Sequence, residues 1–488
     1  MVVTLLANIL HTREDGLRLF LCVLAEYPLA AYHRSALYKK PINIQHIFFI
    51  ITGLILHVFY CAVANFIAFS QFRQCTAVSY TIHSLILIVC TYIITNLLGG
   101  KSESIFAAHV CLLGYLLVGY WYEESDGYDI IWTTPFCVMT LRYIGLVMDV
   151  YDGYHYEKLE PGQKKTAITD VPGIVEIAAF GFFYSGTFVG PQFTLKKFRQ
   201  CVNGKWLDKQ KRPRQSAIQA SLYRFLGGCV YMMLNICGNA WLPNSYFSTA
   251  EFYNQTFFWR WTLVTIWSRL VVSRYCGMWM IAEGPAILNG LGYNGTDDRG
   301  EDRWDGVRDI DVWKWETGHD FTSCIQSFNR GTNAWVKNNV MRRLRWLNSK
   351  PAAHIITLGY LAIWHGYHLG YFLLFGMEFG CVLAQEQLYS LIKSTPEWFE
   401  FNAKPFMRPF IWIFGRLTLL YSMGFGFLSF GLVKTKNWIG PVKSLYFIGY
   451  IFYFLVWPLF YHVLLYILPK KSKDITTTTT PSSLPSSM

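Results

Sequence analysis

The stretch AAHIITLGYLAIWHGYHLGYFLLFGMEFGCV, residues 352–382, decides the class of this protein. It is longer than the ~20 apolar residues that a helix needs to cross about 30 Å of hydrocarbon. An ionisable side chain, His365, lies near the middle of this stretch. A polar group at that depth is costly unless it faces a cavity or a partner, so His365 is a candidate functional residue.

Similar apolar stretches recur along the chain. The stretch 17–33 is weaker because it holds Glu26 and Pro28, and 171–192 is flanked by proline–glycine pairs that indicate a broken or re-entrant segment. The sequence therefore predicts an all-α, polytopic membrane protein with about nine to eleven transmembrane helices. The strongest candidates lie near 45–70, 76–98, 104–121, 130–149, 216–238, 257–282, 352–382, 408–433 and 445–468.

The composition supports a membrane protein. Of 488 residues, 53% are hydrophobic and only 15% are charged, against about 25% charged in a typical soluble protein. A soluble fold would leave too much apolar surface in water, and a disordered chain would be far less hydrophobic. We therefore expect membrane lipid to surround most of the chain.

The net charge of +12 indicates membrane topology rather than a nucleic-acid partner. The basic residues gather in short segments between apolar stretches, as the positive-inside rule predicts. The basic segment 193–215 is therefore expected in the cytosol, and so is the loop 284–350 two spans later. No feature of the sequence fixes the number of subunits.

We expect one membrane domain over residues 1–469, followed by a low-complexity, disordered cytosolic tail over 470–488. The 12 cysteines form no CxxC pair, so neither a disulfide framework nor a metal finger is expected. No metal site is predicted.

A second candidate segment precedes the apolar stretch, FTSCIQSFNRGTNAWVKNNVMRRLRWLNSK at 321–350. Its basic cluster, which includes Arg342 and Arg343, has two interpretations. The cluster marks the cytosolic side or contacts anionic lipid, or it binds phosphates of a substrate.

Position alone does not distinguish His365 from His57, His83 and His109, which also lie in apolar stretches. Two neighbours add context. Gly366 and Gly370 are spaced for close approach of another helix or a substrate, and His368 is expected one helical turn from His365, on the same face.

Together these segments resemble the membrane-bound O-acyltransferase family. The resemblance runs from about residue 140 to 385 and is most specific where WHG follows an asparagine in the preceding segment. The motifs that carry it are YDGY at 151–154, VPGIVEIAAFGFFYSGTFVGPQF at 171–193, CGMWMIAEGPAILNGLGYNG at 276–295, WDGVRDIDVWKWET at 304–317, SFNRGTNAWV at 327–336, RRLR at 342–345 and WHGYHLGYFLLF at 364–375.

The resemblance implies helices that enclose a central reaction chamber in the endoplasmic reticulum membrane. It implies an acyl-CoA:lysophospholipid O-acyltransferase that acts on the sn-2 hydroxyl of lysophosphatidylcholine, and also of lysophosphatidylethanolamine and lysophosphatidylserine. It further implies a preference for polyunsaturated acyl-CoA, which is a co-substrate, with no permanently bound cofactor. The catalytic histidine and asparagine fall on His365 and Asn329, and Arg342 and Arg343 are the weaker candidates for the phosphates of coenzyme A.

Two other functions remain as alternatives. A transporter or channel shares the hydropathy and uses ionisable residues inside the membrane, but no internal repeat pairs the two halves of the chain. A membrane di-iron desaturase needs several histidine clusters, and His365 and His368 form only one HxxH pair.

Overall fold

The computed structural model describes residues 2–9, 13–61, 77–122 and 133–468. Over these residues the chain forms helices, and the only β structure is two isolated bridges, Leu207–Pro213 and Thr296–Asp302. The all-α prediction is confirmed. The predicted tail 470–488 and part of the predicted span 45–70 lie outside the described residues.

The N-terminal group of helices surrounds α7, whose residues 138–150 are all buried. Because protein covers α7 on every side, this helix can carry the charged residues Arg142 and Asp149 within a predicted span. The group comprises α1 (Val2–Ile9), α2 (Glu14–Ser35), η1 (Leu37–Lys39), α3 (Ile42–Cys61), α4 (Ala77–Leu98), α5 (Ser102–Ala108), η2 (His109–Leu113), α6 (Gly114–Tyr122), α7 (Thr133–Tyr154), η3 (Tyr156–Lys158), α8 (Pro161–Lys164), α9 (Ile174–Gly181) and α10 (Leu195–Val202).

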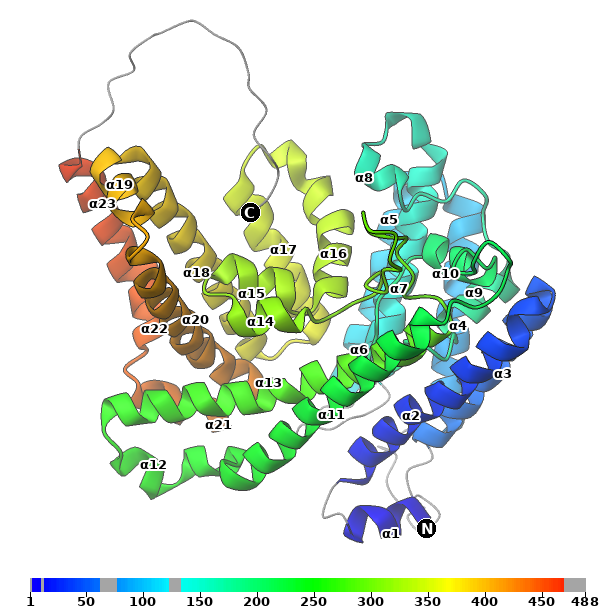
Figure 1. Cartoon of the computed structure of the whole chain (residues 1–488), viewed down its shortest axis with the longest axis horizontal. Helices are drawn as coiled ribbons and strands as arrows, with labels where there is room; N and C mark the ends of the chain where they lie inside the picture. The colour runs from blue at the N-terminus through cyan, green and yellow to red at the C-terminus, as the bar shows by residue number, and fades with distance from the viewer. Residues whose placement is uncertain (1, 10–12, 62–76, 123–132, 469–488) are drawn as a thin grey trace, which may run out of the picture.

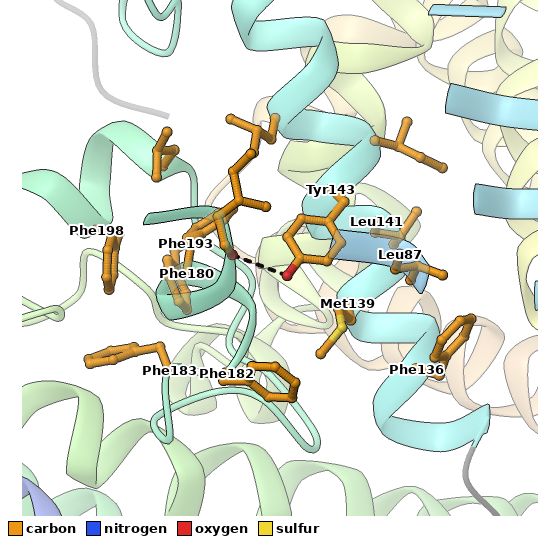
Figure 2. Packing of buried hydrophobic residues seen from close by; sticks show 14 of the residues in the cluster. Leu87, Phe136, Met139, Leu141, Tyr143, Phe180, Phe182, Phe183, Phe193 and Phe198 are labelled. Atoms are coloured by element: carbon orange, nitrogen blue, oxygen red, sulfur yellow. Dashed lines mark hydrogen bonds between the residues drawn. The ribbon is translucent and has the colours of Figure 1, made fainter. Parts of the chain in front are cut away.

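The segment 171–192 is broken, as predicted: α9 ends at Gly181 and the chain then continues without regular structure. Arg142 of α7 donates hydrogen bonds to the carbonyl oxygens of Phe180 at 3.2 Å and Gly186 at 2.5 Å. The Tyr143 hydroxyl donates to the carbonyl of Ile177 at 3.1 Å, beside an aromatic cluster from α9, α10 and the segment between them (Figure 2). Irregular backbone is tolerated at membrane depth only where protein satisfies its polar groups, and Arg142 does so here.

Two long helices, α11 (Ser216–Trp241) and α13 (Phe257–Leu288), pack side by side and join the two halves of the molecule (Figure 1). Two short elements, η4 (Asn244–Ser248) and α12 (Ala250–Asn254), connect them. α13 contacts α2 of the N-terminal group and also α20 of the C-terminal group. It is therefore a structural element of both halves.

The C-terminal group is built around α17, α18 and α20, which contact one another in sequence. The shorter helices α14 and α15 of this group lie on its side nearest α13 (Figure 1). The group comprises α14 (Val312–Thr317), α15 (Phe321–Ser327), α16 (Arg330–Asn339), η5 (Met341–Leu347), α17 (Lys350–His365), α18 (Leu369–Ser394), α19 (Pro396–Ala403), α20 (Met407–Gly431), α21 (Thr435–Ser444), α22 (Ile448–Ile451), η6 (Phe452–Val456) and α23 (Trp457–Ile467).

The prediction of one continuous helix over 352–382 is wrong. α17 ends at His365 and α18 begins at Leu369. Gly366 has φ +122°, a conformation that L side chains rarely adopt and that no helix continues through. His365 therefore lies at a helix end rather than in the middle of a span. His368 precedes the next helix and does not share a helical face with His365.

Among the described helices, six are long and apolar enough to cross a membrane. The predicted total of about nine to eleven also counted α7, α13 and the 352–382 segment and, at its upper end, α2 and the segment 171–192. These carry charged residues, an internal proline or a break, and much of their surface is covered by other helices. Hydropathy alone does not separate such helices from lipid-facing ones, so the total stays a prediction. The six lie at Ile42–Cys61, Thr81–Leu98, Ser102–Tyr122, Ser216–Ser248, Met407–Gly431 and Ile448–Ile467.

Gly370 packs directly against α20, and its role there is testable. A Cβ atom at this position would lie 2.1 Å from the carbonyl oxygen of Ser429, so Gly370→Ala should force α18 and α20 apart. We expect a loss of about 1–3 kcal/mol, measured as a lower Tm in detergent. Gly376→Ala on the same helix meets nothing within 4 Å and should leave the Tm unchanged or raise it. Equal Tm values for the two variants would contradict the close contact.

Candidate functional site

A cavity in the C-terminal half is lined by side chains from α13–α18 and α20. The space between its atoms is about 1300 Å³, part of which is continuous with solvent. Both predicted catalytic residues, His365 and Asn329, line it. Most of the remaining wall is apolar, with aromatic side chains from Tyr275, Trp279, Trp315, Phe321, Phe328, Phe375, Phe427 and Phe430.

The His365 ring is held by other rings rather than by hydrogen bonds. It stacks on Phe375 with 5.7 Å between ring centroids and meets the edge of Phe430 at 5.3 Å. Tyr371 lies 5.7 Å away on the third side. Among the described residues, neither ring nitrogen has a hydrogen-bond partner, so both are available to a substrate in the cavity.

The three histidines that sequence position did not distinguish from His365 have hydrogen-bond partners within the protein. His57 is fully buried and contacts the Gly53 carbonyl at 2.7 Å through Nδ1. His83 Nδ1 lies 2.7 Å from the Tyr115 hydroxyl. His109 Nδ1 lies 2.7 Å from the carbonyl of Ile105. Their polar atoms are used in the fold, which separates His365 from them where sequence position did not.

Asn329 occupies a turn between α15 and α16 with φ +49° and ψ +43°. This left-handed conformation costs most residues about 1–2 kcal/mol, and asparagine tolerates it better than most. Asn333, one turn later, donates to the carbonyls of Ile325 at 3.0 Å and Phe328 at 2.9 Å. These bonds fix the turn and therefore the direction in which the Asn329 side chain leaves the backbone.

Asp309 supports the same turn through two hydrogen bonds. Its Oδ1 accepts the backbone N–H of Gly331 at 2.9 Å, and its carbonyl accepts that of Arg330 at 3.0 Å. The preceding residue, Arg308, pairs with Glu283 of α13 at 3.2 Å. The loop is therefore anchored to α13 on one side and holds the start of α16 on the other. Asp309 is a positioning residue that the sequence did not reveal.

Removing this support should destabilise the protein. Asp309→Ala leaves the half-buried Gly331 N–H without its acceptor, which is expected to cost about 1–3 kcal/mol. Asp309→Asn keeps an acceptor and should cost less. Both are measured as Tm in detergent. An alanine variant as stable as the asparagine variant would contradict the role of this bond.

The same group predicts a pH dependence. Burial raises the pKa of Asp309 from 3.8 to about 7, and the hydrogen bond from Gly331 opposes this rise. The folded protein thus binds the Asp309 proton more tightly than the unfolded chain does. The stability that this proton adds is fully present below about pH 4 and is lost as the pH rises through about 7. Between about pH 5 and about pH 8, wild-type Tm should fall more than that of Asp309→Asn. Equal falls in Tm for the two proteins would contradict the assignment of this pH dependence to Asp309.

The structure places the other predicted residues outside the cavity. Arg343 pairs with Asp152 of α7 at 3.0 Å, and Arg342 lies against Gly162 of α8. His368 does not line the cavity either. Gly366 ends α17, so the expected Gly366–Gly370 helix-packing pair does not form on one helix.

Comparison with known proteins then decides the family. A family model described as "MBOAT, membrane-bound O-acyltransferase family" matches residues 117–424, which include every cavity-lining residue except Phe427 and Phe430. This chain belongs to that family. It is similar to the protein named lysophospholipid acyltransferase 5 of Caenorhabditis elegans, with 58% identity over 97% of both chains. It is also similar to the human protein of the same name, with 33% identity over 96% of this chain and 93% of the relative.

A more distant relative carries a broader name. The lysophospholipid acyltransferase of Schizosaccharomyces pombe is 27% identical over 91% of this chain and 86% of its own length. As a membrane-bound O-acyltransferase with several apolar helices, the chain is a multi-pass membrane enzyme of the acyltransferase class.

Three ionisable residues of this acyltransferase line the cavity but were missed in the sequence: Arg269 of α13, Glu378 of α18 and Arg416 of α20. Each lies inside a predicted span, and a charge there is itself a signal of function. Apolar neighbours concealed this signal, because the mean hydropathy over a predicted span stays high when the span contains only a few charged residues. The described residues contain no group of three or more His, Cys, Asp or Glu placed to hold a metal ion.

Proposed function

We propose that the protein is an acyl-CoA:lysophospholipid O-acyltransferase. It transfers a polyunsaturated acyl group from acyl-CoA to the sn-2 hydroxyl of lysophosphatidylcholine, and also of lysophosphatidylethanolamine and lysophosphatidylserine, in the endoplasmic reticulum membrane. The names of its relatives support this acceptor class. One observation supports this chemistry: His365 and Asn329 line the same largely apolar cavity. Among the described residues, the ring nitrogens of His365 have no hydrogen-bond partner.

In this proposal His365 is the general base. A neutral imidazole takes the proton of the acceptor hydroxyl as its oxygen attacks the thioester carbonyl carbon. The carbon–sulfur bond then breaks, and the proton passes from the imidazole to the leaving thiolate of coenzyme A. No protein nucleophile is needed, because the acceptor attacks directly.

The Asn329 side-chain amide would donate a hydrogen bond to the thioester oxygen as negative charge develops there. Its fixed turn keeps the donor oriented before the substrates bind. The apolar and aromatic wall suits fatty acyl chains.

The deciding experiment is an assay of the purified protein in lipid nanodiscs with a panel of acyl-CoAs and lysophospholipids. Release of coenzyme A and formation of the diacyl product should be equal. Polyunsaturated donors should give the highest kcat/KM with lysophosphatidylcholine. Movement of lipid or ions without consumption of acyl-CoA would instead favour the transporter alternative.

A further inference from the structure

One wall of the cavity carries a compact charged cluster, defined by Arg269 of α13, Arg416 of α20 and Glu316 of α14. Arg269 Nη2 donates to both Glu316 carboxylate oxygens at 2.8 and 2.6 Å. Arg416 Nη1 donates to the carbonyls of Trp315 at 3.0 Å and Gly318 at 2.7 Å, and its Nη2 lies 3.7 Å from Glu316. Both arginines line the cavity.

Counted within this cluster alone, two arginines and one glutamate leave one excess positive charge; Glu378, the other carboxylate that lines the cavity, forms no ion pair among the described residues. Two guanidinium groups face a single carboxylate, whose Oε1 also accepts the Tyr231 hydroxyl at 2.5 Å. Among the described residues, Arg269 uses only Nη2, so its Nε and Nη1 donors are available. An excess cation beside apolar walls is costly, and an anionic ligand would offset that cost.

A rigid stack of rings connects this cluster to the proposed catalytic asparagine. The guanidinium of Arg269 lies 4.6 Å from the ring centroid of Trp315. Trp315 in turn stacks on Phe328, with 4.8 Å between centroids and an interplanar angle of 28°. Phe328 immediately precedes Asn329 in the chain. The position of the charge is therefore fixed relative to Asn329.

We propose that Arg269 and Arg416 bind the phosphate of the lysophospholipid acceptor and so set its sn-2 hydroxyl beside His365 and Asn329. This rests on the proposed function and names a specificity-determining site within it. A phosphodiester carries one negative charge, which matches the single excess positive charge of the cluster. The guanidinium fork also fits two phosphate oxygens at once. Coenzyme A also carries phosphates, so the test must distinguish the two sources.

The main variant is Arg269→Gln, because Arg269 bonds only to Glu316 whereas Arg416 also holds backbone carbonyls. Its KM for lysophosphatidylcholine should rise about tenfold, the loss expected for a bond to a charged group. Its KM for acyl-CoA should stay within about twofold. The variant should use a 1-acylglycerol acceptor, which lacks the phosphate, as efficiently as the wild type does. Arg408→Gln, an exposed arginine on α20, is the matched control.

An unchanged KM for lysophosphatidylcholine would overturn the proposal. So would a parallel rise in the KM for acyl-CoA, which would assign the cluster to coenzyme A. If Arg269→Gln does not fold, Arg269→Lys decides: it keeps the charge but loses the fork, so the same KM must rise by about threefold. A wild-type protein without transfer activity would contradict the proposed function itself, whereas an active wild type with an insensitive variant would contradict only this phosphate site.

Discussion

His365→Ala is expected to lower kcat for acyl transfer by about 10²–10⁴-fold, the usual contribution of a general base. The protein should still fold, because the His365 ring makes no hydrogen bond to any described residue and packs against neighbouring rings. The measurement is kcat and KM with acyl-CoA and lysophosphatidylcholine in nanodiscs, together with Tm.

His368→Ala is the matched control for this variant. It removes a histidine three positions away that does not line the cavity, and activity should stay within about threefold of wild type. A folded His365→Ala enzyme that keeps wild-type kcat would remove the histidine from the mechanism.

The second large effect is expected at Asn329. Loss of a donor to developing negative charge lowers kcat by about 10²–10³-fold. Alanine would also strain the left-handed turn, so its effect would mix folding with catalysis. Asn329→Gly avoids this, because glycine adopts φ +49° without cost. Asn329→Asp keeps the shape but removes the amide donor. Both should lose kcat while retaining Tm.

Asn348 provides the control for the backbone. It also has a positive φ, +51°, but lies at the end of η5 and does not line the cavity. Asn348→Gly should leave kcat unchanged. Full activity in Asn329→Gly, with the fold intact, would assign Asn329 a role in backbone geometry alone.

The sequence predicted the features that depend on residue type along the chain. Apolar stretches predicted the helices, and the flanking proline–glycine pairs predicted the broken segment 171–192. Motif resemblance selected His365 and Asn329, and the structure places both in one cavity. Their catalytic roles stay predictions until the variants above are measured.

Other features depend on tertiary contacts and could not be predicted this way. The break after His365 is caused by one backbone angle at Gly366, and the residues on both sides remain apolar, so hydropathy shows a single span. Arg269 and Arg416 lie in predicted membrane spans, yet they line a cavity whose walls come from distant segments. Asp309 also acts through a tertiary contact, because its partner Gly331 lies beyond two intervening helices.

Because α13 packs against both the N-terminal and the C-terminal group of helices, this enzyme cannot be shortened freely. The α13 residues Arg269, Val272, Tyr275 and Trp279 line the cavity. Just beyond them, Ile281 and Ala282 are fully buried in a cluster with Val23 of α2. An engineered fragment made of the C-terminal helices alone would expose those two residues and lose the anchor of its own cavity wall. Truncation and domain transplantation should therefore preserve the entire N-terminal group as part of one folding unit.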